Sequence, residues 1–125
     1  MIQAESWLTP RDNSGARAVE CIRALGGFHR SFAAPGDRLV VSVKRLRRTG
    51  ARKVQAGEVH LALLARTRFP TRFLDGTSSR AEGNRVLLIN RKGRVLGTRI
   101  FGWLSRRLRR KKFTRLLLLG GRHTL

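Results

Sequence analysis

The residues best suited to chemistry lie near the C-terminus. A turn bracketed by glycines runs from Gly97 to Gly102 and presents Arg99 between them. It is followed by the segment from Arg106 to Lys112, in which six of seven residues are cationic. Guanidinium and ammonium groups hold phosphate through charge-assisted hydrogen bonds, but this segment offers no group for a covalent reaction. The pattern favours a phosphate-binding, structural role over catalysis.

The other reactive side chains do not form a recognisable catalytic or metal site. His29, His60 and His123 are scattered, without the spacing of metal ligands. No two acidic residues are spaced as a general acid and base, and Ser14 sits in a turn without an obvious base. The segment Gly93–Gly97 lacks the Gly-Lys-Ser/Thr end of a phosphate loop. We therefore expect no catalytic residue, metal, cofactor or small-molecule substrate.

The overall charge indicates a polyanionic partner. The 125 residues, a length typical of one domain, contain 28 Lys+Arg and 7 Asp+Glu, a formal net charge of +21. Such a chain repels itself until an anion neutralises it, and nucleic acid is the commonest candidate. A membrane surface is the alternative, although apolar runs such as Leu116–Leu119 are far too short to span a bilayer. Arginine greatly outnumbers lysine, which suits RNA but also fits a GC-rich genome. The single cysteine, Cys21, excludes an internal disulfide and is expected to be buried.

These cations must be positioned by short strands. Turn signals such as Pro35-Gly36-Asp37 and Asp75-Gly76 separate the apolar segments. Strands at this spacing predict a small, mostly antiparallel β-barrel, because closure removes exposed strand edges. Arg38–Lys44 is rich in β-branched residues with a period-two apolar face, and the other expected strands are the apolar segments Ala18–Leu25, Val59–Ala65 and Val86–Ile89. Core positions on them are Val41, Val43, Leu61, Leu63 and Leu88.

Helical periodicity occurs in one place. Phe101, Leu104 and Leu108 fall at i, i+3 and i+7, which predicts a short amphipathic helix after Gly102. Leu116–Leu119 is either a late strand or the end of a helix. Ile100 and Phe101 are expected to anchor the turn in the core.

Two further basic loops are candidates for phosphate contact. The loop from Lys44 to Lys53 has cationic flanks around Gly50, as in a hairpin extension. The loop from Arg66 to Arg72 places Phe69 among cations, where it either stacks on a base or packs beneath the loop.

Motifs along almost the whole chain resemble the ribosomal protein L-fourteen family of the large subunit. Each motif alone is weak evidence for this family, but their order and spacing together are highly specific for it. They are Met1-Ile2-Gln3, Asp12-Asn13-Ser14-Gly15-Ala16, Cys21-Ile22-Arg23, Leu25-Gly26-Gly27, Gly36-Asp37, Val40-Val41-Ser42-Val43-Lys44, Arg66-Thr67, Asp75-Gly76, Gly83-Asn84, Leu87-Leu88-Ile89-Asn90, Gly97-Thr98-Arg99-Ile100-Phe101-Gly102 and Lys112-Phe113.

The resemblance implies one mainly β domain over residues 1–125. Its fold would be a small five-stranded antiparallel β-barrel with a long basic hairpin and a short C-terminal helical segment. Its function would be that of a structural constituent of the large ribosomal subunit, which binds large-subunit rRNA and contributes to bridges with small-subunit rRNA. The implied neighbours are ribosomal proteins L-three and L-nineteen, and a ribosome-silencing factor docks on this protein in bacteria and organelles.

The contact residues follow from the basic segments and the turn. The expected rRNA-binding residues are Lys44, Arg45, Arg47, Arg48, Arg52, Lys53, Arg68, Arg72, Arg99, Arg106, Arg107, Arg109, Arg110, Lys111 and Lys112. The expected contacts with the other subunit or a partner are Gly97, Thr98, Arg99 and Gly102. The alternative for Arg99 is a structural cation, and for Gly102 a plain turn glycine.

The chain also departs from the family pattern. Trp103-Leu104 stands where the family has Pro-Val, and Arg107 stands where it has glutamate. This drift and the high charge favour a mitochondrial ribosome, with a plastid or bacterial ribosome as alternatives.

Two other classes compete with a ribosomal protein: a free RNA-binding module or RNA chaperone, and a basic amphipathic membrane binder. Sedimentation with the large subunit, or its absence, separates them.

Overall fold

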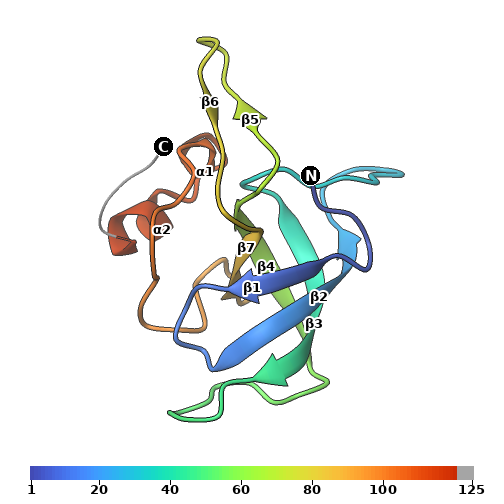
Figure 1. The fold of residues 1–125 in the computed structure, drawn as a ribbon, viewed down its shortest axis with the longest axis vertical. Coiled ribbons are helices and arrows are strands. Elements are labelled where there is room, and N and C mark those ends of the chain that lie inside the picture. The colour runs from blue at the N-terminus through green and yellow to red at the C-terminus, as the bar shows by residue number, and fades with distance from the viewer. Residues whose placement is uncertain (121–125) are drawn as a thin grey trace.

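Residues 1–120 are described by the computed structural model of the chain (Figure 1), and within them five strands close into a barrel. The strands are joined around the barrel in the order β1-β2-β3-β4-β7. Their bounds are Trp7–Pro10 for β1, Ala16–Ala24 for β2, Arg38–Leu46 for β3, Val59–Arg66 for β4 and Arg85–Ile89 for β7. The four strands expected from the sequence are confirmed. β1 was missed because it is short and ends in a proline, which weakens a strand pattern.

The barrel is mixed, whereas an antiparallel barrel was expected. β1 pairs with β2 antiparallel but with β7 parallel, with Thr9 opposite Arg85 and Pro10 opposite Val86. The other pairings, β2 with β3, β3 with β4 and β4 with β7, are antiparallel. The parallel pair joins the first and the last strand of the barrel, so no hairpin constrains its direction.

Irregular register allows this small sheet to curve enough to close. The pairing of β2 with β3 shifts between Ala16 and Ala18 and again between Cys21 and Arg23. The pairing of β4 with β7 shifts between Leu64 and Arg66. Bulges of this kind bend a strand and increase its twist.

β4 and β7 are buried on both faces. Ala62 and Leu64 point into the barrel interior, together with Val41 and Leu88. Leu63 belongs instead to a second apolar cluster outside the barrel wall, with Leu87, Ile89 and Leu104 among others. These runs are therefore continuously apolar, as in strands covered on both sides. Of the expected core residues, Val41, Val43, Leu63 and Leu88 are fully buried, whereas Leu61 is only partly buried.

The C-terminal segment covers that outer face with two short helices, α1 (Arg107–Arg110) and α2 (Thr114–Leu119), which settles Leu116–Leu119 as helical. Leu108 and Leu116 are their buried contacts. Helices this short are not stable alone, so their position depends on this packing. Neither is long and apolar enough to cross a bilayer, nor is any other helix within residues 1–120.

The expected amphipathic helix begins later than predicted. Residues 101–106 are not helical, and α1 starts only at Arg107. Phe101 is 40% exposed, so its expected role as a core anchor was wrong, whereas Ile100 is buried as expected. The spacing misled because Leu104 packs against the barrel from an irregular segment.

A small hairpin projects from the barrel beside these helices (Figure 1). It consists of β5 (Thr71–Arg72) and β6 (Ser78–Ser79), which pair antiparallel. Asp75 and Gly76 form its tip, and Gly76 has the positive φ of 85° that this turn requires.

Candidate nucleic-acid interface

Asn13 holds the glycine-bracketed turn in place. Its Oδ1 accepts hydrogen bonds from the backbone N–H groups of Thr98 (2.6 Å) and Arg99 (3.0 Å). Its Nδ2 donates to Thr98 Oγ1 at 2.7 Å. A Cβ at Gly97 would collide with Asn13 Oδ1, so the turn needs glycine there for space.

A buried carboxylate fixes the base of this turn to the barrel. Asp12 is fully buried, and its Oδ2 accepts a hydrogen bond from the Leu88 backbone N–H at 3.0 Å. Its Oδ1 accepts from both the backbone N–H and the hydroxyl of Ser14. Asp12 also pairs with Ile100 in an antiparallel bridge. Thr98 and Arg99 are exposed, so a rigid base presents their side chains outward.

The loop between the antiparallel strands β3 and β4 folds back toward the same turn. Its backbone N–H groups at Arg47 and Lys53 donate to Gly15 O and Ser14 O, each at 2.8 Å. Val54 is only 2% exposed and belongs to the barrel core. The Lys53 ammonium therefore reaches the Leu96 carbonyl at 3.1 Å, next to the turn.

Part of the charge in this loop has partners within the chain. Lys44 pairs with Glu20 at 3.1 Å, and the Arg45 guanidinium lies 5.9 Å from the Trp7 ring centroid. Arg47 is half-buried, with its guanidinium 3.3 Å from the Asp12 carbonyl and 5.8 Å from the Phe101 ring centroid. The cations Arg48, Arg52, Lys53 and Arg99 are exposed. We call the group Arg47, Arg48, Arg52, Lys53, Thr98 and Arg99 the loop surface.

The basic C-terminal block lies on a different part of the molecule, against the β5–β6 hairpin. The Arg106 guanidinium lies 4.5 Å from the Phe73 ring centroid and 3.3 Å from Asp75 Oδ2. Hydrogen bonds from Thr77 are the main reason that the pKa of Asp75 lies below its usual value, with Arg106 adding to them. Arg106 is therefore a structural contact as well as a candidate RNA contact.

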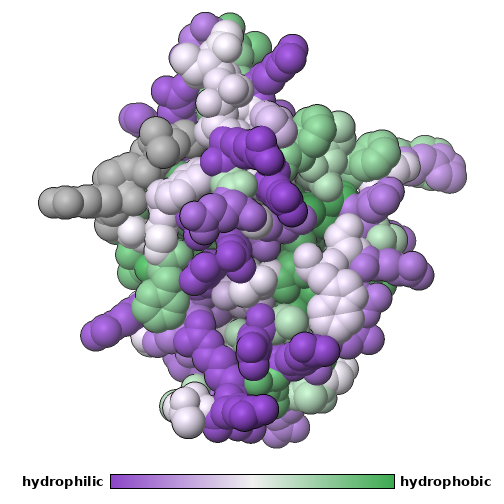
Figure 2. Space-filling model, in the orientation of Figure 1, coloured by the Kyte–Doolittle hydropathy of each residue, from purple (hydrophilic) through white to green (hydrophobic). Residues whose placement is uncertain are grey.

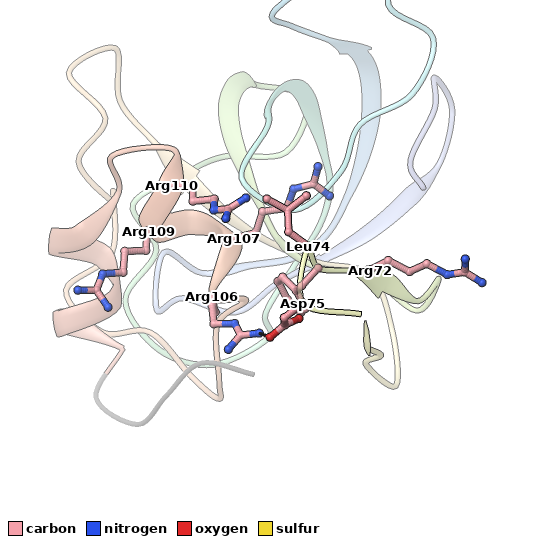
Figure 3. A pocket seen from close by; sticks show the side chains of 8 residues that line it. Arg72, Leu74, Asp75, Arg106, Arg107, Arg109 and Arg110 are labelled. Atoms are coloured by element: carbon pink, nitrogen blue, oxygen red, sulfur yellow. Dashed lines mark hydrogen bonds and ion pairs between the residues drawn. The ribbon is translucent and has the colours of Figure 1, made fainter. Parts of the chain in front are cut away.

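A shallow pocket of about 410 Å³ opens between this block and the hairpin. We call its cations, Arg72, Arg106, Arg107, Arg109 and Arg110, the hairpin surface. In Figure 3, Arg72 and Arg109 point away from the pocket in opposite directions, while Arg106 reaches Asp75. Arg107 is half-buried and the other four are exposed.

A third basic groove was not found from the sequence. Lys111 and Lys112 line it, and Lys111 lies 3.6 Å from Asp37. The groove also contains four cations that the sequence analysis did not single out, Arg38, Lys92, Arg94 and Arg115. These four come from three separate segments of the chain, so only tertiary contacts bring them together. Figure 2 shows hydrophilic side chains distributed over the visible face, with smaller hydrophobic patches between them.

The remaining candidates are dispersed. Arg68 is exposed, and its backbone N–H donates to Asn84 Oδ1 at 3.0 Å. Phe69 is 55% exposed and does not pack beneath its loop, whereas Phe73 lies under Arg106. Sequence spacing did not distinguish these two phenylalanines.

The geometry of the reactive residues fits structural roles. His60 pairs with Glu58 at 2.7 Å, and this hydrogen bond lowers the pKa of Glu58. Cys21 is buried as expected, and burial raises the pKa of its thiol. Within residues 1–120 no three His, Cys, Asp or Glu side chains gather as metal ligands. His123 lies outside the described residues.

The arrangement therefore offers exposed cations and a backbone turn held by hydrogen bonds. Guanidinium groups of this kind bind phosphate oxygens, often bidentately. In a comparison with known protein families, the model of the family described as "Ribosomal protein L14p/L23e" matches residues 1–123.

Proposed function

Because the chain belongs to the ribosomal protein L14p/L23e family, a structural family of the large ribosomal subunit and not an enzyme family, we propose that it binds large-subunit rRNA through its two basic surfaces and lies at the subunit interface. The loop surface and the hairpin surface supply the phosphate contacts. The net charge of +21 supports the proposal, because a surface so charged gains most from a polyanionic partner.

The observation that carries the interface role is the turn held by Asn13. Its two backbone hydrogen bonds and the buried Asp12 beneath it leave little freedom to residues 97–99. Thr98 and Arg99 are thereby ordered before any partner arrives, which lowers the entropy cost of binding. Within the loop surface, we assign Thr98 and Arg99 the contacts with small-subunit rRNA and the remaining cations the contacts with large-subunit rRNA.

Protein neighbours and location complete the proposal. By family resemblance, the neighbours are ribosomal proteins L-three and L-nineteen, and a ribosome-silencing factor docks near the turn. The protein is ribosomal, and the drifted, highly basic C-terminal block favours a mitochondrial ribosome over a plastid or bacterial one.

Sedimentation of the tagged protein in its own cells tests this function. We expect it to migrate with the large subunit and to cross-link to large-subunit rRNA. Reversing the charge of Arg99 (Arg99→Glu) should leave it in the large subunit while reducing the fraction of joined ribosomes. A protein that stays at the top of the gradient would indicate the RNA chaperone alternative, and one that floats with lipid would indicate a membrane binder.

A further inference from the structure

Three arginines meet at one end of the barrel, outside both basic surfaces. Arg66 of β4 and Arg85 of β7 are directly opposite each other in the antiparallel pairing. Arg11 follows β1, and its backbone N–H donates to Val86 O at 3.0 Å, which places it beside Arg85. All three are half-buried.

This cluster has an unfavourable electrostatic arrangement in the free chain. Like charges directly opposite each other destabilise a sheet. Burial is the main cause that lowers the pKa of Arg66 and of Arg85, and the charge of Arg11 lowers both further. The charge of Glu82 acts in the opposite direction and raises the pKa of both arginines, but Glu82 is exposed.

The cluster also lacks internal partners. Within residues 1–120, no ion pair joins Arg11, Arg66 or Arg85 to a carboxylate. The Nε of Arg11 is buried and has no hydrogen-bond partner there. Buried donors are nearly always satisfied in folded proteins, so this one points to a missing acceptor.

The residues around the cluster orient Arg66 and leave space beside the guanidinium groups. The Arg66 guanidinium stacks 4.9 Å from the Trp103 ring centroid. A Cβ at Gly102 would lie 3.1 Å from an Arg66 nitrogen, and one at Gly83 would lie 3.5 Å from the Arg85 guanidinium carbon. Both glycines thus let backbone run beside the cations without covering them.

We propose that Arg11, Arg66 and Arg85 form a binding site for a phosphate group of large-subunit rRNA. This inference rests on the proposed function. A phosphate supplies acceptors for several guanidinium donors and relieves the repulsion among them. RNA fits better than a single protein carboxylate because exposed Arg68, bonded through its backbone to Asn84 beside Arg85, offers a place for the next phosphate.

The experiment compares three versions of the full chain: wild type, Arg11→Gln/Arg85→Gln, and a control, Arg17→Gln/Arg23→Gln. The control loses the same charge from exposed positions on β2. The first measurement is the rise in Tm caused by inorganic phosphate over chloride at equal ionic strength. We expect the cluster variant to be more stable than wild type in chloride but to lose most of the rise with phosphate. The control should keep that rise.

The second measurement is binding to large-subunit rRNA at several salt concentrations. Loss of one phosphate contact should reduce the log–log salt slope by about 0.7–0.9 in the cluster variant relative to the control. An equal phosphate effect on all three proteins would overturn the site. A third outcome is that phosphate raises the Tm of wild type and control only, while the cluster variant binds rRNA normally but is not incorporated into the subunit. This outcome would assign the site to a protein carboxylate and overturn the RNA assignment. Failure of wild type to bind rRNA would overturn the proposed function and this RNA assignment, while the phosphate measurement still decides whether an anion site exists.

Discussion

Asn13 and Thr98 are 85 positions apart in sequence and are joined by two hydrogen bonds, from Asn13 Nδ2 to Thr98 Oγ1 at 2.7 Å and from the Thr98 backbone N–H to Asn13 Oδ1 at 2.6 Å. The turn after β1 and the turn near residue 97 are therefore one structural unit. Arg99 owes its exposed, ordered position to this pairing, since its own N–H is also bonded to Asn13.

Replacing Asn13 by alanine should loosen this unit. Loss of the three hydrogen bonds should lower the free energy of unfolding by about 1–3 kcal/mol, measured by urea denaturation. The control is Asn90→Ala, which removes an acceptor for the Arg94 N–H in another turn and should cost less. If both variants lose the same free energy of unfolding, the Asn13 side chain stabilises the fold no more than an ordinary turn residue does.

Adding a methyl group at Gly97 should be harmful for reasons of space. The new Cβ would meet Asn13 Oδ1 and lie 3.1 Å from the Asn13 backbone nitrogen. We expect Gly97→Ala to destabilise the fold by about 1–3 kcal/mol. At Gly27 a Cβ meets only the Arg30 side chain, at 3.5 Å or more, so Gly27→Ala should change thermal stability little. A Gly97→Ala protein as stable as wild type would show that the turn relaxes freely.

Adjacent leucines on β4 should both be essential to the core. Leu63 and Leu64 are fully buried on opposite faces of the strand. Each change to alanine should cost about 2–5 kcal/mol in chemical denaturation. Leu61→Ala should cost less because Leu61 is only partly buried. If Leu63→Ala costs almost nothing, the C-terminal segment does not cover this face in solution.

The acidity of Asp75 should depend more on Thr77 than on Arg106. Hydrogen bonds from Thr77 are the larger cause of the lowered pKa, and Arg106 is the smaller one. Carboxyl NMR titration should therefore show a larger rise in pKa for Thr77→Val than for Arg106→Gln. Because the folded-state pKa is depressed, any stability from this carboxylate is present above its unfolded pKa and is lost as pH falls through the folded value. The reverse order of the two variants would contradict the geometry.

The hairpin surface should set a large part of the salt dependence of rRNA binding. If the block from Arg106 to Lys112 contacts about six phosphates, its contribution to the log–log slope is roughly −4 to −5. Removing three of its cations, as Arg107→Gln/Arg109→Gln/Arg110→Gln, should reduce the slope by about 2. Arg106 is left intact because it holds the hairpin through Asp75. The control is a variant with exposed Arg17, Arg23 and Arg91 changed to glutamine. If the slope of the hairpin-surface variant is as steep as that of the control, this surface does not contact RNA.

The local sequence determined much of the fold and of the charge. A period-two apolar pattern located β3, and short apolar runs between turn signals located β2, β4 and β7, because both are properties of neighbouring residues. The turn at Gly97 and the cationic block from Arg106 were equally visible as short motifs. The family resemblance rested on the same kind of local information.

Only the tertiary structure decided how these pieces meet. The parallel pairing of β1 with β7, the second buried face of β4 and the bonds from Asn13 to the distant turn all join residues far apart in the chain. So does the convergence of Arg11, Arg66 and Arg85, of which only Arg66 belongs to a basic loop visible in the sequence. Sequence patterns indicate which residues are apolar enough to be buried and which carry charge. Long-range packing then determines which of them become neighbours.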